Sequence, residues 1–272
     1  MRNKKQRTAP ESGSDLQLFA WIQLKRKQQF TLEETARAFG MSSNQAAKLL
    51  SRLSQKGLIL RLIKGVYLAP EKLPPGGKWG PDRLWVLSRL MAFYQAKYQI
   101  TGQEAFHRYG FSDQLPNEVA VYNTRISGLR KIGVIRYRFI KVPAKRIGAT
   151  DPLGIGEDLK IPISSRARAL VDALYDWSRF NTIPGAFRWI ESEIRGKRGN
   201  DFVSDLVDAA VRYGNVGTVR RLGYVLTLHG VSSQRLTRLR RAAPTTTSLI
   251  PLDPNQPKRG KTDTQWGVVV NE

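Results

Sequence analysis

The stretch FTLEETARAFGMSSNQAAKLLSRLSQKGLILRLIKGVYLAP, residues 30–70, decides the fold of the N-terminal part of the chain. It contains two helical patterns with a glycine between them. Thr31 followed by Glu34 is a capping-box pattern, which predicts that a helix begins there. Gly40 predicts the end of that helix, and a serine at 42–43 predicts the cap of the next one. The stretch therefore predicts two short helices joined by a tight turn.

The second helical pattern has one apolar face and one polar face. Its apolar residues recur at helical spacing and predict one buried stripe: Ala46, Leu49, Leu50 and Leu53. The opposite face carries hydrogen-bonding and cationic side chains without an acid: Asn44, Gln45, Lys48, Ser51, Arg52 and Gln55. Amides can pair with adenine edges, and cations with guanine edges or phosphates. This face therefore has the composition of a helix that enters the major groove of DNA.

A hairpin is expected after this helix. Gly57 ends the helix, and LILRLIKGVYLAP after it is rich in β-branched and aromatic residues, with Lys64-Gly65 at its bend. Helix, turn, helix and basic hairpin is the order of a winged helix-turn-helix, whose wing contacts the DNA backbone or the minor groove. The predicted DNA-binding residues are Ser43, Asn44, Gln45, Lys48, Ser51, Arg52, Arg61 and Lys64. A plain αα-hairpin, or a winged helix that docks on another protein, would share parts of this pattern.

The charge balance of the whole chain favours a polyanionic ligand. The 272 residues include 45 lysines and arginines against 22 acids, a formal net charge of +23. Residues 1–79 carry a net +10 and the remainder a net +13, so the excess is not confined to a tail. Each cation placed on a phosphate releases condensed counterions, which favours nucleic acid. The alternative is surplus charge that serves solubility.

Composition also argues against several kinds of site. The chain has no cysteine and only two histidines, which excludes disulfides and makes thiolate or imidazole metal centres unexpected. No apolar run approaches the roughly 18 residues of a membrane span, and no apolar stretch follows the basic N-terminus as in a signal peptide. We therefore expect a cytoplasmic protein with no membrane contact, no metal and no cofactor.

Shifts in composition divide the chain into four segments. Residues 1–13 predict a disordered basic arm, and residues 14–70 the winged helix-turn-helix domain. Residues 71–82, with three prolines and three glycines, predict a linker to a larger mixed α/β domain at 83–272. The predicted fold class is therefore α+β. A first helix that begins at Asp15 is expected to use five apolar residues: Leu16, Phe19 and Ala20, with Ile22 and Leu24 as further candidates.

The C-terminal domain is expected to combine one sheet with a run of helices. Strands are predicted over residues 98–101, 118–124, 134–142 and 161–163. Helices are predicted over residues 83–97, 102–110, 164–180, 183–195, 201–214, 216–230 and 232–242, with serine caps at 164–165 and 232–233. The segment TQWGVVVN, residues 264–271, is expected to return to the same sheet as its last strand.

Two short motifs could carry chemistry. Glu104 and His107 have the spacing of an acid–base pair on one helix, but a general base needs a further partner. Asp158 and Lys160 resemble the acid-x-Lys pair of metal-dependent nucleases, although two-metal chemistry needs several convergent carboxylates. We predict no catalytic residue and no enzyme. A metal-dependent DNA nuclease, brought to DNA by the winged helix, is the alternative function.

A second basic region lies near the C-terminus. No acid occurs between Arg212 and Pro251, whereas six arginines recur there: Arg220, Arg221, Arg235, Arg238, Arg240 and Arg241. They are the candidates for a second basic surface that contacts phosphates or docks an acidic partner. A merely solvated face would have the same composition.

The order of several motifs resembles a known family. The chain has KGVYLAP after the two helices, then YQITGQEAFHRYGFSDQLPNEVAVYNT, ISSRARALVDALYD and DTQWGVVVN. From about Phe30 to the C-terminus, this order is similar to that of the AbiEi antitoxins of AbiE-type (type IV) abortive-infection, or phage-defence, toxin–antitoxin systems. The resemblance implies a repressor of its own operon that binds inverted repeats in double-stranded operator DNA. It also implies a C-terminal domain that counteracts a cognate nucleotidyltransferase-like toxin, directly or indirectly.

Overall fold

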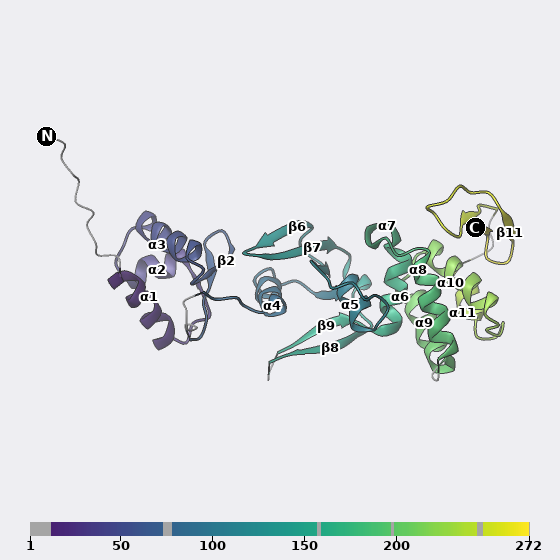
Figure 1. Cartoon of the computed structure of the whole chain (residues 1–272), viewed down its shortest axis with the longest axis horizontal. Helices are drawn as coiled ribbons and strands as arrows, with labels where there is room; N and C mark the ends of the chain where they lie inside the picture. Colours follow the sequence, from purple (N-terminus) through teal and green to yellow (C-terminus); the bar gives the residue numbers. More distant parts are fainter. Residues whose placement is uncertain (1–11, 73–77, 157–158, 197–198, 244–246, 272) are drawn as a thin grey trace. The chain divides into compact units, whose positions relative to one another are not determined.

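The computed structural model describes residues 12–72, 78–156, 159–196, 199–243 and 247–271. The chain is a mixed α+β protein that divides into two compact units (Figure 1). The N-terminal unit is Met1–Leu90 with Lys131–Ile135, and the C-terminal unit is Met91–Arg130 with Arg136–Glu272. The division falls inside α4 (Arg83–Phe93), beyond the linker expected at 71–82. The four predicted segments remain predictions.

Three helices and a small sheet form the N-terminal unit up to residue 72. The helices are α1 (Ser12–Leu24), α2 (Leu32–Ala38) and α3 (Ser43–Gln55). The strands β1 (Gln29–Thr31), β2 (Leu60–Ile63) and β3 (Val66–Leu68) form an antiparallel sheet in the order β1-β3-β2. The predicted hairpin is β2 and β3. The sequence did not predict β1, because a three-residue strand has no periodicity of its own and forms through its pairing with β3.

The predicted helix starts are confirmed. Thr31 and Glu34 make both hydrogen bonds of a capping box at the start of α2, and Ser42 and Gln45 make those of a second one at the start of α3. At the hairpin bend, Gly65 has φ +79°, a left-handed conformation that glycine adopts without steric penalty. Local hydrogen bonds and one glycine thus fix the turn, the helix starts and the hairpin.

The core of this unit confirms the stripe of α3 and corrects that of α1. All four predicted residues of α3 are buried. On α1 the buried side chains are Leu18, Phe19 and Ile22, whereas Leu16 and Leu24 are 73% and 81% exposed. Residues 16, 20 and 24 also recur at helical spacing, so the sequence offered two stripes on opposite sides of α1. Only the packing against α3 selects one of them.

A six-stranded mixed sheet lies in the C-terminal part of the chain, in the order β6-β7-β5-β4-β9-β8. Its strands are β4 (Tyr98–Thr101), β5 (Val119–Asn123), β6 (Gly128–Ile132), β7 (Ile135–Lys141), β8 (Thr150–Ile155) and β9 (Leu159–Ser164). The strands predicted near β4, β5, β7 and β9 are confirmed. The edge strands β6 and β8 were not predicted, because glycines, cations and a proline weaken their strand pattern. At the β8 edge, Pro152 lies opposite Pro162 of β9.

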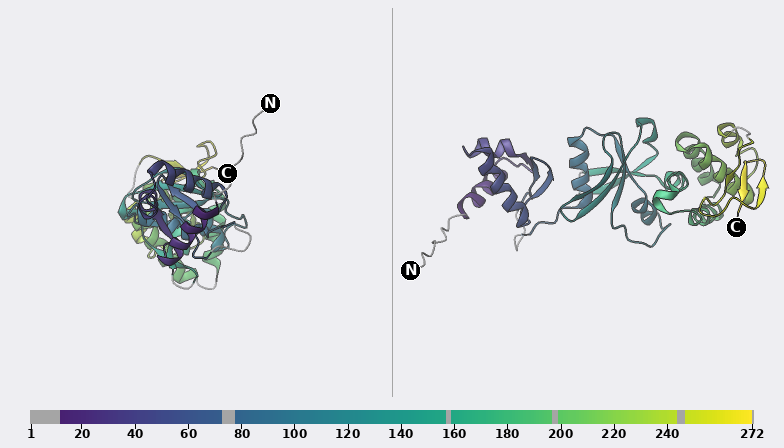
Figure 2. Two further views of the ribbon diagram at one scale, coloured as in Figure 1. Left: turned by 90° about the vertical axis from the view of Figure 1, so that its left-hand side faces the viewer. Right: turned by 90° about the horizontal axis from the view of Figure 1, so that it is seen from above.

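Most of the helices of this part of the chain pack at one end of the sheet (Figure 2). The helices of this part are α5 (Gln103–Arg108), α6 (Arg166–Tyr175), α7 (Trp177–Phe180), α8 (Gly185–Arg195), α9 (Gly199–Tyr213), α10 (Val216–Leu228) and α11 (Thr237–Ala242), with a short 3-10 helix at Ala144–Arg146. Helix α6 contacts β9, α8, α9 and α10, so it joins the sheet to the helical layer. Ser165 caps α6 as predicted. The cap predicted at 232–233 is wrong, because α11 begins after Leu236 without a side-chain cap.

The last strand does not return to the main sheet, contrary to the prediction. β12 (Val268–Val270) lies between β10 (Ile250–Pro251) and β11 (Lys261–Asp263) in a separate small sheet. Trp266, just before β12, packs on α10: a Cβ on Gly223 would lie 2.3 Å from two of its ring atoms. Its indole N–H also donates to the hydroxyl of Thr227 at 2.9 Å. These contacts hold the segment on α10 and away from β4–β9.

A buried polar cluster centres on Asp172 of α6. Its Oδ1 accepts hydrogen bonds from Arg168 Nε at 2.8 Å and from Arg146 at 3.0 Å. Its Oδ2 accepts from the hydroxyls of Thr101 and Ser164, each at 2.9 Å. Arg168 and Asp172 are fully buried. The cluster ties β4, β9 and the segment after β7 to α6.

Candidate nucleic-acid interface

The polar face of α3 is exposed along most of its length. Ser43, Asn44, Gln45, Lys48 and Ser51 all have exposed side chains, as predicted for a helix face that contacts a ligand. Among the described residues, Asn44 and Lys48 have no side-chain hydrogen bond or ion pair. The buried stripe on the other side of α3 fixes which way this face points. A carboxamide and an ammonium group are thus available to bases or phosphates.

Gln45 has a structural task that the sequence interpretation had not assigned to it. Its Oε1 accepts hydrogen bonds from the Ser42 backbone N–H at 2.8 Å and from the Ser42 hydroxyl at 3.0 Å. The Ser42 hydroxyl in turn accepts from the Gln45 backbone N–H at 3.3 Å. The amide oxygen of Gln45 therefore caps α3, and only its NH₂ group is left to face a ligand.

Arg52 is held by an acid from another helix. Its NH2 group lies 2.5 Å from Oδ1 of Asp15, and the Arg52 side chain is 26% exposed. The other oxygen of Asp15 lies 3.2 Å from the ammonium group of Lys56. One carboxylate of α1 thus pairs with two cations near the end of α3. Asp15 thus interrupts the face of α3 that the sequence predicted to be free of acids. The sequence of α3 alone does not reveal this acid, because it lies 37 residues earlier in the chain.

The hairpin presents its two predicted cations to solvent. Arg61 on β2 and Lys64 at the bend are exposed, whereas Leu62 and Tyr67 are buried. Arg61 lies opposite Tyr67 in the register of β2 and β3. Among the described residues, neither cation has an ion-pair partner. The hairpin therefore exposes two cationic side chains, while its apolar side chains pack into the core.

An ion pair and an aromatic ring brace α2 against α1. The ammonium of Lys27 lies 2.5 Å from the carboxylate of Glu34 and 5.4 Å from the ring centre of Trp21. The hydrogen bond from Lys27 holds the pKa of Glu34 below its usual value, so this carboxylate is ionised at neutral pH. The Trp21 ring meets Phe30 edge-on, with centroids 6.0 Å apart. These contacts fix α2, on which α3 rests.

The C-terminal arginines do not form the single surface that the sequence suggested. Arg220 and Arg221 are buried: Arg220 donates to the carbonyl of Ser248 at 2.9 Å, and Arg221 to those of Pro251 and Leu252 at 3.1 Å. Burial lowers the pKa of Arg221. These two arginines hold the segment before and within β10 against α10. Their carbonyl partners come from about 30 residues away, which no local pattern reveals.

The other four arginines differ among themselves. Arg235 and Arg241 are exposed, and Arg238 is exposed but forms an ion pair with Asp208 of α9. The guanidinium of Arg240 lies 6.0 Å from the ring centre of Trp266 and donates to the hydroxyl of Ser233 at 3.2 Å. The candidate surface is thereby reduced to Arg235, Arg238 and Arg241.

The two motifs considered for catalysis are not brought together with further reactive groups. His107 is exposed at the end of α5, whereas Ala105 and Phe106 of the same helix are buried. Asp158 lies outside the described residues, and Lys160 is exposed on β9. Within the ranges that the structure describes, no three histidine, cysteine or acidic side chains converge as metal ligands.

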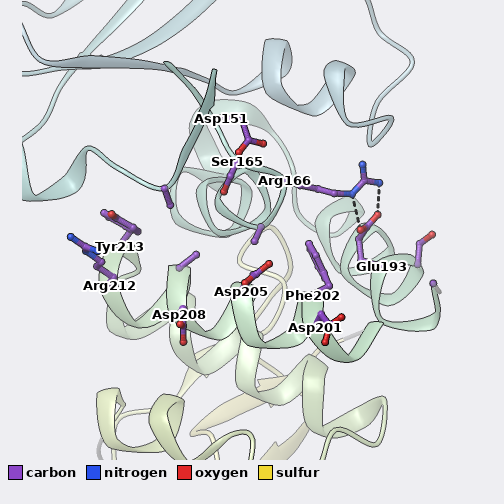
Figure 3. Close-up of a pocket in the computed structure, with 15 residues that line it drawn as sticks. Asp151, Ser165, Arg166, Glu193, Asp201, Phe202, Asp205, Asp208, Arg212 and Tyr213 are labelled. Atoms are coloured by element: carbon purple, nitrogen blue, oxygen red, sulfur yellow. Dashed lines mark hydrogen bonds and ion pairs between the residues drawn. The ribbon is translucent and has the colours of Figure 1, made fainter. Parts of the chain in front are cut away.

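A groove of about 1000 Å³ lies in the C-terminal unit, among β8, α6, α8 and α9 (Figure 3). Five carboxylates and two arginines line it: Asp151, Glu193, Asp201, Asp205 and Asp208, with Arg166 and Arg212. Arg166 donates to both oxygens of Glu193, at 2.7 and 2.6 Å. Sequence analysis missed this groove, because its walls come from distant segments. Its excess of carboxylates repels phosphates, so it is not part of a nucleic-acid interface.

Comparison with known proteins agrees with the N-terminal pattern. Residues 21–70 match the family described as transcriptional regulator, AbiEi antitoxin. This match confirms the predicted AbiEi resemblance for residues 21–70, and the resemblance beyond residue 70 stays a prediction. The AbiEi match includes α2, α3 and the hairpin, and therefore all eight predicted DNA-binding residues of the N-terminal unit.

The fold of the whole chain also has a solved counterpart. The crystal structure of the RV2827C protein from Mycobacterium tuberculosis superposes with a TM-score of 0.59 at 15% sequence identity. The match covers 97% of this chain and 92% of that one, and it shows a shared fold. No curated protein matches the chain. Within the described ranges, no helix combines the length and the apolar composition needed to cross a bilayer.

Proposed function

We propose that the chain is a cytoplasmic DNA-binding autorepressor and antitoxin, with a winged helix-turn-helix at residues 14–70. The observation that carries this proposal is the exposed, acid-free outer face of α3 beside a cationic hairpin, within the range that matches AbiEi regulators. Helices α2 and α3 with their tight turn are the helix-turn-helix, and β2–β3 is the wing. The partner is double-stranded operator DNA, with inverted repeats that two copies of the chain would share.

The contacts on DNA divide by chemistry. Asn44 and Lys48 are assigned to base edges, because their polar groups have no partner within the described part of the chain. Ser43 and Ser51 are assigned to phosphates, and the wing cations to the backbone or the minor groove. Gln45 contributes mainly by capping α3, and Arg52 contributes as part of the pair with the acid of α1.

We expect Asn44→Ala and Lys48→Ala each to weaken binding to the DNA upstream of the gene by about 1–3 kcal/mol, the usual cost of removing a side chain that reads a base edge. Both side chains are exposed on a capped helix, so the fold should persist. Gel shifts with the upstream duplex and with a scrambled duplex of equal length measure the effect. Arg52 is unsuitable for this test, because its removal would leave Asp15 without its closest cation.

The matched control is Lys25→Ala, which removes an exposed cation from the loop after α1. It should leave the preference for the upstream duplex unchanged. Equal operator affinity for the wild type and both α3 variants would show that another face meets the DNA. If the wild-type chain does not shift the upstream duplex at all, the N-terminal unit is a protein-docking module.

The antitoxin role is assigned to residues 83–272, so it should be separable from repression. In cells that express the cognate toxin from an unrelated promoter, the double variant Asn44→Ala/Lys48→Ala should restore growth as well as the wild type does. Loss of rescue at equal protein levels would contradict the modular assignment. Incubation with plasmid DNA and Mg²⁺ or Mn²⁺ tests the enzyme alternative: nicking that disappears in Asp158→Ala would replace the proposed function.

A further inference from the structure

The groove of Figure 3, here called the acidic groove, concentrates negative charge in a chain that is otherwise strongly basic. It is lined by five of the chain's 22 acids and by two arginines, whereas the chain as a whole has a formal net charge of +23. Its volume of about 1000 Å³ is large for a ligand pocket, for which about 300–1000 Å³ is usual. The groove therefore has room for several side chains of a bound partner.

Three of these acids recur along the exposed side of α9. Asp201, Asp205 and Asp208 lie at i, i+4 and i+7, so they share one side of the helix, and Figure 3 shows them in a row. The opposite side of α9 packs into the core, where Leu206 and Ala210 are fully buried. At a rise of about 1.5 Å per residue, the three acids extend over about 10 Å of helix. The groove thus offers a line of negative charge and not a single point.

Most of these carboxylates have no cation of the chain to neutralise them. Within the described ranges, Asp201 and Asp205 are exposed and form no ion pair, whereas Asp208 pairs with an arginine of α11. On the opposite wall, Asp151 accepts a hydrogen bond at 2.8 Å from the hydroxyl of Tyr109, which carries no charge. Three of the five carboxylates therefore form no ion pair in the part of the chain that the structure describes.

A buried hydroxyl that lines the groove has no partner either. Tyr213, at the C-terminal end of α9, is 5% exposed. Its hydroxyl lies close to Gly148, the residue before Ala149 of the groove wall. The guanidinium of Arg168 lies 4.1 Å from the centre of its ring, but within the described ranges its hydroxyl makes no hydrogen bond. Native proteins rarely leave a buried polar group unpaired, because this is costly. The hydroxyl is therefore available to a ligand in the groove.

We propose that the acidic groove docks a lysine- and arginine-rich segment of the cognate toxin. The inference rests on the proposed antitoxin function, and it names the surface and the chemistry by which the C-terminal unit recognises its partner. Ammonium and guanidinium groups donate to the carboxylates of α9 and to the oxygen of Tyr213. The rest of the chain carries a large positive charge and repels such a segment, so the electrostatic field directs it to this groove.

The spacing of the acids favours a peptide segment over a metal ion. A divalent cation needs several oxygen ligands that converge on one point, and within the described ranges no three acidic or histidine side chains do so. Asp201 and Asp205 are instead separated by about 6 Å along the helix axis. In an extended chain, side chains on the same side recur about every 6.6 Å. Alternate cations of an extended segment can therefore meet successive carboxylates of α9.

The test measures the affinity of the full chain for the purified toxin by calorimetry at several salt concentrations. The groove variant combines Asp201→Asn and Asp205→Asn, because these substitutions leave no arginine of the described chain unpaired. The control variant combines Glu71→Gln and Asp113→Asn, two exposed acids outside the groove. Both variants lose two negative charges, so a difference between them reports where the charge lies and not how much of it there is.

The groove variant should bind the toxin about 5- to 30-fold more weakly than the wild type, the effect of losing two ion pairs between partly exposed groups. The control variant should match the wild type. Rising salt should weaken the wild type more steeply than the groove variant, because salt screens exposed charges. Equal toxin affinities of the groove and control variants would overturn the proposal. A change in the oligomeric size of the groove variant without toxin would also overturn it, because the groove would then join copies of this chain.

Tyr213→Phe tests the buried hydroxyl. It removes one oxygen and keeps the ring on which the guanidinium of Arg168 lies. Since the hydroxyl has no hydrogen bond to lose within the described chain, the unfolding temperature should not fall. The affinity for the toxin should fall about tenfold, the effect of losing a hydrogen bond to a charged group. A lower unfolding temperature with unchanged toxin affinity would contradict the assignment of this hydroxyl to the groove.

Two further measurements separate this inference from the proposed function. In cells that express the toxin from an unrelated promoter, the groove variant should restore growth less well than the control variant at equal protein levels. Its operator affinity should equal that of the wild type, because α3 is unchanged. A wild-type chain that restores growth without binding the toxin would overturn the docking proposal and leave the antitoxin function in place. A wild-type chain that does not restore growth would refute the antitoxin function, and the calorimetry would still support or overturn the acidic groove.

Discussion

Replacing Asp172 by alanine should destabilise the C-terminal unit by about 3–5 kcal/mol, a large part of the about 5–15 kcal/mol that keeps a typical domain folded. The carboxylate is the shared acceptor of Arg146 and Arg168, whose residues are 7% and 0% exposed. Without it, two buried guanidinium groups lose their counter-charge and keep backbone carbonyls and tyrosine rings, which carry no full negative charge, as partners. Urea unfolding of the full chain, followed by circular dichroism, measures the change.

The matched control is Glu191→Ala. Glu191 and Arg195 of α8 are also an i, i+4 acid–arginine pair in the C-terminal unit, 2.7 Å apart, but their side chains are 31% and 72% exposed. An exposed pair of this kind contributes less than about 1 kcal/mol. If Asp172→Ala lowers the free energy of unfolding no more than Glu191→Ala does, the buried cluster around Asp172 does not stabilise the unit as expected. Combining Asp172→Leu with Arg168→Met should recover part of the loss, because it removes buried charge from both sides.

The second large effect is expected from Leu50→Ala, which should cost the N-terminal unit about 2–5 kcal/mol. Leu50 is fully buried in the cluster formed by α1, α3 and the small sheet. A unit of this size buries a modest core and has little stability in reserve. We therefore expect operator binding to be lost at about 37 °C, because the outer face of α3 is presented only while its inner face is packed. Gel shifts at two temperatures, with thermal unfolding in parallel, follow the loss.

Leu16→Ala is the control for this prediction. It removes the same atoms from α1, but Leu16 is 73% exposed, so stability should change by less than about 0.5 kcal/mol. Normal operator binding by a destabilised Leu50→Ala protein would show that DNA binding does not depend on the packing of α3. Loss of binding in a Leu50→Ala protein that is fully folded would show that this residue acts other than through the core.

The sequence predicted best what local interactions determine. The capping box of α2, the serine cap of α3, the buried stripe of α3 and the bend at Gly65 all follow from residues close to each other in the sequence. The strand β1 and the separate sheet around β12 depend on partners far along the chain, so composition could not assign them. On α1, two equivalent stripes made the sequence ambiguous, and packing resolved it.

In the candidate site, too, the sequence predicted the side chains that local periodicity places and missed the contacts made by distant partners. Outward side chains such as Asn44 and Lys48 could be assigned from the periodicity of their own helix. The pairing of Arg52 with Asp15 and the burial of Arg220 and Arg221 could not, because the partner atoms lie about 30 or more residues away. Counting cations along the sequence therefore overestimated the basic surface near the C-terminus.

Pro152 on β8 has a consequence for how other chains can associate with this one. Since neither Pro152 nor Pro162 has an N–H, their antiparallel pair occupies a non-hydrogen-bonded position, and the nitrogen of Pro152 faces the open edge of the sheet. An incoming strand would find no donor there, which discourages edge-to-edge aggregation and domain swapping at β8. A partner that recognises this side of the C-terminal unit would therefore have to bind through side chains, and not by extending the sheet with a strand of its own.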